Sequence, residues 1–406
     1  MIHLLTNARL HRPEADGIRH FVVGGGRVLA ILEEQPNLAG VPHRTRDLEG
    51  RWVIPGLVDA HLHLGGGGGE AGAASRVPSL VIEDLTATGT TTVVGLLGTD
   101  DLTRTPVDLH ATVRGLRTLG LDAWMWTGGY HVPPVTVTGS VRSDLVLLRE
   151  CIGVGELALS DHRSSQPTLD ELLRVAADVH VAGLMTGKAG VLHLHMGDGE
   201  RGLDLVRRAL DTSELPPRVF HPTHTNRRTA LFEEALALAQ RGCTIDITTF
   251  PPDLAEGDEL LAVDALERAW ESGVDRSRVT MSSDGGGCLP RFDADARVTG
   301  FDVGQPATLM DALLETVRRG ATLADALAPL TSNPADLLRL DAGRIEENAP
   351  AHLVVLDAAE RSDLDGRSAQ DLVRDVMVHG VFHRRDGHQV VHDPFSASSD
   401  STSSTS

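Results

Sequence analysis

The sequence predicts an α/β protein whose larger part is a (β/α)₈ TIM-type barrel. Short β-rich segments alternate with helical ones from Leu57 onward. There are eight such segments within roughly 230 residues, which matches the strand count of a closed barrel. A doubly wound open sheet is the alternative. The predicted strands are residues 57–63, 90–97, 123–129, 152–161, 190–196, 218–224, 243–250 and 278–284.

Local signals justify the individual elements. TTTVVGLL (90–97) and CTIDITTF (243–250) are rich in β-branched residues, which favour strands. TLDELLRVAADVHVAGL (168–184) begins with a capping box, Thr168 to Glu171, which favours a helix that starts there. The other strand and helix segments repeat this alternation along the chain.

Both ends of the chain are β-rich. Residues 22–31, VVGGGRVLAI, turn through glycine as in a β-hairpin. We predict that residues 1–54 and 343–393 pair into a small β-sandwich domain beside a barrel domain of residues 55–342. The serine-rich tail, 396–406, is predicted to be disordered. Four histidines of the C-terminal hairpins are predicted to lie on the surface: His379, His383, His388 and His392.

The composition excludes several classes of function. A formal net charge of −20 over 406 residues, with no basic cluster, argues against nucleic acid or an anionic membrane as a partner. No long apolar run and no leader-like segment occurs, so we expect a cytoplasmic protein. The three cysteines are far apart and form no CxxC pair, which excludes a cysteine zinc site. Histidines and carboxylates would therefore have to hold any metal.

Histidines and one carboxylate lie where predicted strands end. His61 and His63, in LVDAHLH, are two residues apart, so their side chains point to the same face of the strand. His195, His224 and Asp284 end three later strands. These five side chains converge at one rim if the barrel closes, and they suit Zn²⁺. His193 points the same way as His195 but lies deeper, as a core residue or a neighbour of the ligands.

Seven segments of the chain are typical of a known family, namely PGLVDAHLH, GGGGEAG, TGGYHVP, SDHRS, HMGDG, PTHTNR and SSDGGG. In these segments the chain resembles the amidohydrolase superfamily and, within it, the isoaspartyl dipeptidases. The resemblance implies two zinc ions, one held by His61 and His63 and the other by His195 and His224. Asp284 would touch the first ion and carry protons. The resemblance also implies a homo-oligomer.

The sequence departs from this family at the bridging ligand. The family uses a carboxylated lysine shortly before SDHRS, whereas this chain has Glu156 in GVGELALSDHRS. Its only lysine, Lys188, lies in the GKAG turn before the fifth predicted strand, which is not the place of the bridging residue. Glu156 supplies the same negative charge on a shorter side chain, and an extra residue at Gly155 suggests a β-bulge that would bring it inward. We predict that Glu156 bridges two zinc ions. The alternatives are that Glu156 supports a single ion or contacts only a histidine near the ligands.

Polar residues after other strands would select the substrate. The resemblance implies that Glu70, after the glycine loop, binds an ammonium group and that Tyr130 stabilises an oxyanion. Arg163 and Arg227 suit carboxylates. Thr99 would add a hydrogen bond, and Cys288 stands where the family has serine.

We therefore predict a zinc-dependent hydrolase that uses metal-activated water to cleave the β-aspartyl bond of isoaspartyl dipeptides. Asp284 would transfer the proton and Tyr130 would stabilise the oxyanion. One alternative keeps the fold but changes the amide, to an N-acyl amino acid or a cyclic imide. The other is a catalytically inactive homologue that acts as a binding protein.

Overall fold

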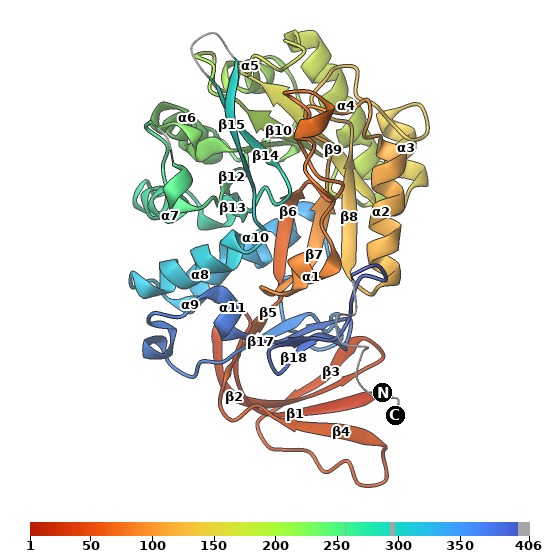
Figure 1. Ribbon diagram of the computed structural model, residues 1–406, viewed down its shortest axis with the longest axis vertical. Helices are drawn as coiled ribbons and strands as arrows, with labels where there is room; N and C mark the ends of the chain where they lie inside the picture. Colours follow the sequence, from red (N-terminus) through yellow and green to blue (C-terminus); the bar gives the residue numbers. More distant parts are fainter. Residues whose placement is uncertain (256, 293–296, 397–406) are drawn as a thin grey trace, which may run out of the picture.

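The computed structural model describes residues 1–255, 257–292 and 297–396, and shows two regions (Figure 1). The upper region contains parallel strands and most of the helices, whereas the lower region is a sheet near which both ends of the chain lie. Of the predicted disordered tail, 396–406, only Ser396 belongs to the described residues.

The parallel strands follow one another in chain order. Within the described residues a six-stranded parallel sheet consists of β6 (Leu57–Leu62), β7 (Thr90–Gly95), β8 (Asp122–Thr127), β9 (Cys151–Leu159), β10 (Val191–Met196) and β11 (Phe220–Thr223). β12 (Ile245–Thr248) and β13 (Val279–Ser282) form a second parallel pair. β12 packs beside β11 and β13 beside β6, where Leu62 bridges to Gly285. The sheet is thus curled, and each of the eight predicted segments contains a strand.

Helices follow the strands and cover the curled sheet (Figure 1). The strands that they cover are buried on both faces, and Trp126, Phe220 and Phe232 are fully buried between the layers. None of the helices of the described residues combines the length and the apolar character needed to span a bilayer. The helices are α1 (Ile82–Thr86), α2 (Pro106–Thr118), α3 (Val141–Leu147), α4 (Leu169–Thr186), α5 (Asp204–Thr212), α6 (Thr229–Gln240), α7 (Ala262–Glu271), α8 (Thr308–Arg318), α9 (Leu323–Leu327), α10 (Ser332–Leu338) and α11 (Ala369–Leu372).

Strands from both ends of the chain lie in one sheet. In the described part of the chain it has nine strands, in the order β19-β18-β17-β16-β5-β1-β2-β3, with β4 paired to β1. A separate hairpin, β14 (Cys288–Phe292) and β15 (Val298–Val303), follows β13. The nine strands are β1 (Ile2–His11), β2 (Ala15–Gly24), β3 (Arg27–Leu32), β4 (His43–Asp47), β5 (Trp52–Pro55), β16 (Leu353–Leu356), β17 (Val373–Val378), β18 (Val381–Arg385) and β19 (His388–Gln389).

The predicted surface position of His383 is wrong. His388 and His392 are exposed and His379 is partly exposed, but His383 is fully buried. The pairing of β17 with β18 shifts register between Val376 and Met377, so His383 is the extra residue of a β-bulge. A bulge interrupts the alternation of inward and outward side chains on which the prediction relied.

Candidate metal centre

The six predicted metal ligands come from five strands or from the first two residues after them. His61 lies in β6 and His63 follows it, His195 lies in β10, and His224 and Asp284 follow β11 and β13. Glu156 lies in β9. All six side chains are buried. Because parallel strands end at one edge of their sheet, these residues meet there.

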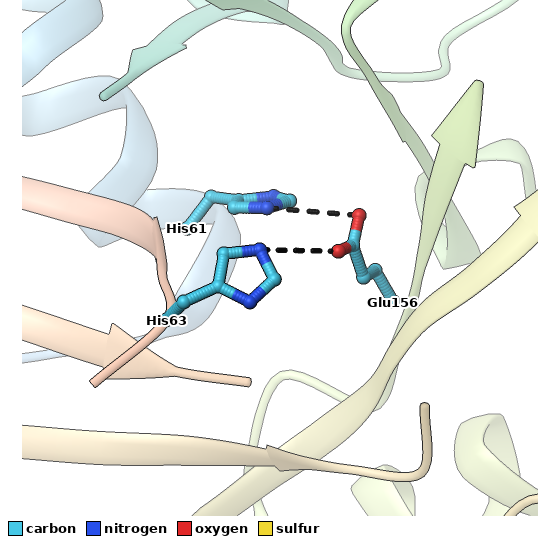
Figure 2. A group of neighbouring side chains, drawn as sticks. All are labelled: His61, His63 and Glu156. Atoms are coloured by element: carbon cyan, nitrogen blue, oxygen red, sulfur yellow. Dashed lines mark ion pairs between the residues drawn. The ribbon is translucent and has the colours of Figure 1, made fainter. Parts of the chain in front are cut away.

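Glu156 faces His61 and His63 (Figure 2). Its Oε2 atom lies 3.6 Å from His61 Nε2, and its Oε1 atom lies 3.4 Å from His63 Nε2. Each carboxylate oxygen thus points toward a different imidazole. Asp284 Oδ1 approaches the same two nitrogens, at 3.3 Å from His61 Nε2 and 3.2 Å from His63 Nε2.

Glu156 also faces the second pair of histidines. Its Oε2 atom lies 3.0 Å from His195 Nδ1 and 3.5 Å from His224 Nε2. The carboxylate therefore lies between the two pairs of imidazoles. A group that bridges two metal ions would lie in such a place, and the bridging role of Glu156 stays a prediction.

A β-bulge brings Glu156 to this position. Val154 of β9 pairs with Leu192 of β10, and Leu157 pairs with Leu194, so Gly155 and Glu156 lie opposite His193 alone. This confirms the predicted extra residue. Position 155 also requires glycine, because a Cβ atom there would lie 2.8 Å from the Cβ of His193.

The charges of these groups depend on one another. Burial alone would lower the pKa of His63, but the adjacent Asp284 and Glu156 carboxylates raise it to about 10. Burial alone would raise the pKa of Glu156, but His61 and His195 hold it well below its ordinary value. The centre is therefore a set of buried, oppositely charged groups in close contact.

The donor set fits a divalent metal ion. Three overlapping groups place one ligand atom from each residue within 4.8 Å of the others: His61, His63 and Glu156; His61, His224 and Asp284; and Glu156, His195 and His224. His61 Nε2 and Asp284 Oδ1 are buried and have no hydrogen-bond partner among the described residues. Imidazole nitrogens and carboxylate oxygens without hydrogen-bond partners are suited to holding a metal ion.

The remote ring nitrogens of three of these histidines have polar partners. His61 Nδ1 lies 2.8 Å from His193 Nε2, His195 Nε2 lies 3.0 Å from Asp161 Oδ2, and His224 Nδ1 lies 2.7 Å from Thr248 Oγ1. Asp161 also accepts two hydrogen bonds from the Arg163 guanidinium. No role is predicted from the sequence for Asp161 or Thr248, although SDHRS contains Asp161. Such contacts orient ligand imidazoles.

A cavity of about 450 Å³ opens onto the metal centre. Every residue predicted to contact substrate lines it, and His61 is the one predicted ligand that does not. The lining includes Glu70, Thr99, Tyr130, Arg163, Arg227 and Cys288.

Glu70 is held in place by its neighbours. Its Oε1 atom accepts a hydrogen bond of 3.1 Å from Thr99 Oγ1, and it lies 3.4 Å from Arg163 Nη1.

Burial, together with the adjacent Glu70 carboxylate, raises the pKa of the Cys288 thiol to about 12, so the thiol stays protonated. The glycine loop before Glu70 folds back on itself, and a Cβ atom on Gly66 would lie 2.0 Å from the carbonyl oxygen of Val77. This glycine therefore serves the fold of the loop.

Tyr130 points from the cavity wall toward the ligands. Its hydroxyl oxygen lies 2.9 Å from His195 Nδ1, and the guanidinium of Arg163 lies 5.4 Å from the centre of its ring. Burial raises the pKa of the Tyr130 phenol well above its ordinary value, so the phenol keeps its proton. A neutral phenol at this position can donate a hydrogen bond to a molecule in the cavity.

The chain is similar in sequence and structure to several known proteins. The model of the Amidohydrolase family matches residues 52–382. The crystal structure of the β-aspartyl dipeptidase of Fervidobacterium islandicum AW-1, in complex with β-Asp-Leu dipeptide, is 38% identical, has a TM-score of 0.87 and covers 96% of this chain and 99% of that chain. A second structure of that dipeptidase is 37% identical, with a TM-score of 0.86 and the same coverage. The dihydroorotase of Anaeromyxobacter dehalogenans strain 2CP-C is 27% identical over 86% of each chain.

Proposed function

The chain belongs to the amidohydrolase family and, within it, to the β-aspartyl dipeptidases, and we propose that it hydrolyses the isopeptide bond of isoaspartyl dipeptides. The observation that carries the proposal is one cavity that joins the metal-ligand cluster to Glu70 and Arg163. A carboxylate and a guanidinium held near the reacting groups match the ammonium and carboxylate groups of a dipeptide.

Two zinc ions would fit the centre. His61 and His63 would hold one, His195 and His224 the other, and the Glu156 carboxylate would bridge them in place of a carboxylated lysine. A single ion would use either pair of histidines together with Glu156. The bound metal supplies the Lewis acidity that activates water and polarises the amide carbonyl.

Asp284 would move the proton. Its Oδ1 atom has no hydrogen-bond partner among the described residues, and its side chain lines the cavity. It can accept a proton from the attacking water and deliver it to the departing amine. Tyr130 would donate a hydrogen bond to the oxyanion, because its hydroxyl lies beside His195 at the edge of the cavity.

The remaining cavity residues would bind the two ends of the dipeptide. Glu70 would bind the free α-ammonium group, with Thr99 holding its carboxylate in place. Arg163 and Arg227 would bind carboxylates. Cys288 would contribute a weak hydrogen bond where a serine would give a stronger one.

We further infer that the eight parallel strands close into a (β/α)₈ barrel of residues 55–342. The contacts of β12 with β11 and of β13 with β6 support closure. The shared sheet of the chain ends supports a small β domain of residues 1–54 and 343–393, in which a β-sandwich stays a prediction. The cytoplasmic location and the homo-oligomer also stay predictions.

A substrate panel tests the proposal. The zinc-supplemented protein is incubated with β-aspartyl dipeptides, their α-linked isomers, N-acyl amino acids and dihydroorotate, and the products are quantified. Selective cleavage of the β-linked peptides is expected. Turnover of dihydroorotate or of N-acyl amino acids alone would support the alternative amides, to which the dihydroorotase similarity points. Zinc binding without turnover of any compound would support a binding protein.

A matched substrate sharpens this test. β-Asp-Leu and its N-acetyl derivative differ only at the amine that Glu70 is proposed to bind. Acetylation should therefore abolish most of the turnover. Equal rates for the two compounds would contradict the role of Glu70 without affecting the metal assignment.

A further inference from the structure

A series of hydrogen-bonded, buried polar side chains begins at His61 of the metal centre. Its members lie nearer the amino ends of the strands than the predicted ligands do. His61 Nδ1 lies 2.8 Å from His193 Nε2, and His193 Nδ1 lies 2.9 Å from His221 Nδ1. His221 Nε2 lies 3.0 Å from Thr280 Oγ1, which lies 2.6 Å from Asp246 Oδ1. All five side chains are completely inaccessible to solvent. We call His193, His221, Thr280 and Asp246 the histidine relay.

The relay connects four different strands below the ligands. Its members lie on β10, β11, β13 and β12, and none of them lines the cavity. Substrate therefore does not touch them. They contact the proposed machinery through the hydrogen bond between His193 and His61, whose other nitrogen faces Glu156 (Figure 2).

The available donors and acceptors determine which atom donates in each hydrogen bond of the relay. Asp246 accepts hydrogen bonds from the hydroxyls of Thr223, Thr280 and Ser282, each of which has one proton to donate. Since the Thr280 hydroxyl donates its single proton to Asp246, its oxygen accepts from His221 Nε2. A neutral imidazole has one donor and one acceptor nitrogen. His221 Nδ1 is consequently an acceptor.

The same reasoning continues to the metal centre. If His221 Nδ1 accepts, His193 Nδ1 donates to it, and His193 Nε2 must accept from His61 Nδ1. His61 therefore carries its proton on Nδ1. In the neutral imidazole that binds a metal ion, the lone pair is then on Nε2, the atom that faces Glu156 and Asp284.

The packing around His193 holds the relay in one arrangement. Its ring stacks on Trp126, with ring centres 5.1 Å apart and an interplanar angle of 11°, and Trp126 Nε1 donates to the carbonyl of Ala60. His193 is also the residue opposite the bulge that carries Glu156. One side chain thus contacts His61 and faces the backbone of Glu156.

We propose that the histidine relay is a positioning device, which holds His61 in the tautomer whose Nε2 atom can bind a metal ion. The proposal rests on the proposed function only in placing a metal ion at His61. Partners of this kind orient a ligand imidazole and set which of its nitrogens is free. Here a carboxylate sets the tautomer through four successive hydrogen bonds.

The test measures metal affinity in the absence of substrate. Zn²⁺ is titrated into metal-free protein against a chromophoric chelator, and retained zinc is counted by mass spectrometry. His193→Phe removes the acceptor for His61, and we expect the affinity for one of the two ions to fall about 10- to 100-fold. His193→Gln can present an amide oxygen to His61 Nδ1 and should recover most of that affinity. Thermal unfolding of each metal-free variant checks that the protein is folded.

Two further variants separate positioning from packing. Asp246→Asn keeps the shape of the anchor but offers an amide N–H to Thr280, so the relay can reverse and the same ion should bind less tightly. His352→Phe makes the same exchange as His193→Phe at another buried histidine and should leave both affinities unchanged.

The outcomes are distinct. Wild-type affinity for both ions in His193→Phe or in Asp246→Asn would overturn the proposal. Equal weakening of both ions in His193→Phe, without recovery in His193→Gln, would also overturn it by indicating a packing role. Wild-type protein that binds zinc but cleaves no β-aspartyl dipeptide would refute the proposed function and leave the relay intact.

Discussion

Two groups of buried histidines lie near opposite ends of the parallel strands, and their ring nitrogens have different surroundings. At the carboxyl ends, His61, His195 and His224 each direct one nitrogen toward Glu156 and the other toward a polar partner. Near the amino end of β8, His352 and His383 are equally buried, yet both nitrogens of each ring have no hydrogen-bond partner among the described residues.

The second group is packed as if its imidazoles were apolar rings. His352 meets His379 edge to face at 4.3 Å between ring centres, and burial lowers the pKa of His352 well below its ordinary value. Burial is therefore common to both groups and does not identify a functional histidine. The contact of the second ring nitrogen does, because only an oriented imidazole presents a lone pair in a fixed direction.

The largest effect is expected from replacing Asp284, the proposed proton carrier of the metal centre. Asp284→Asn keeps the shape of the side chain but cannot accept the proton of the attacking water. We expect kcat for a β-aspartyl dipeptide to fall about 10²- to 10⁴-fold. Bound zinc, counted in the same sample, should stay near the wild-type value because four histidines and Glu156 remain. An active Asn variant would contradict the proton-transfer role.

The next effect concerns the oxyanion. Tyr130→Phe removes a hydroxyl that lies 2.9 Å from His195 Nδ1 and keeps the ring beneath Arg163. A lost oxyanion donor should lower kcat roughly 10²- to 10³-fold with little change in KM. If KM rises while kcat is unchanged, Tyr130 binds the ground state of the substrate instead.

The second histidine group allows a matching test through pH. Burial, with a smaller effect of His379, lowers the pKa of His383 from 6.5 to about 4. The unfolded chain therefore binds a proton in this range before the folded protein does. The stabilising contribution is complete above pH 6.5 and is lost as the pH falls toward 4. Between pH 7 and pH 4.5 the loss should be about 2 to 3 kcal/mol.

Urea unfolding of metal-free protein measures this loss, with His383→Phe as the matched variant. Subtracting the two pH profiles removes the titration of the metal ligands, which both proteins share. The wild-type free energy of unfolding should fall more steeply than that of the variant. Parallel profiles would show that His383 does not resist protonation, and the contrast between the two histidine groups would fail.

Side-chain positions that follow from the alternation within one strand can be predicted from the sequence. Positions that are set by the pairing of two strands are harder to predict. His61 and His63 project together, and His195, His224 and Asp284 end their strands, so local pattern and strand count suffice to bring them together. His383 was misplaced because a bulge between β17 and β18 shifts the alternation. Gly155 was read correctly because the resemblance exposed an extra residue.

The residues that hydrogen-bond to the predicted ligands could not be predicted from the sequence, for a related reason. Asp161 and His195 are 34 residues apart, and their contact requires that the loop after β9 fold over the end of β10. Neither residue type nor spacing within one segment indicates such a contact. The histidine relay is similar, since its four members come from four strands whose order is known only once the sheet has formed.

The smallest effect is expected from replacing Asp161, the partner of His195. This variant tests whether Asp161 positions a ligand as the histidine relay is proposed to do. Asp161 accepts from His195 Nε2 at 3.0 Å and from two nitrogens of Arg163. Asp161→Asn should weaken the ion held by His195 and His224 about 10-fold, by the same competition titration. His193→Phe should instead weaken the ion held by His61 and His63. Since the two variants act on opposite sides of Glu156, cobalt bound in each should give a different visible spectrum. Identical losses from both would show that Glu156 couples the two ions so tightly that neither histidine pair holds a metal ion of its own.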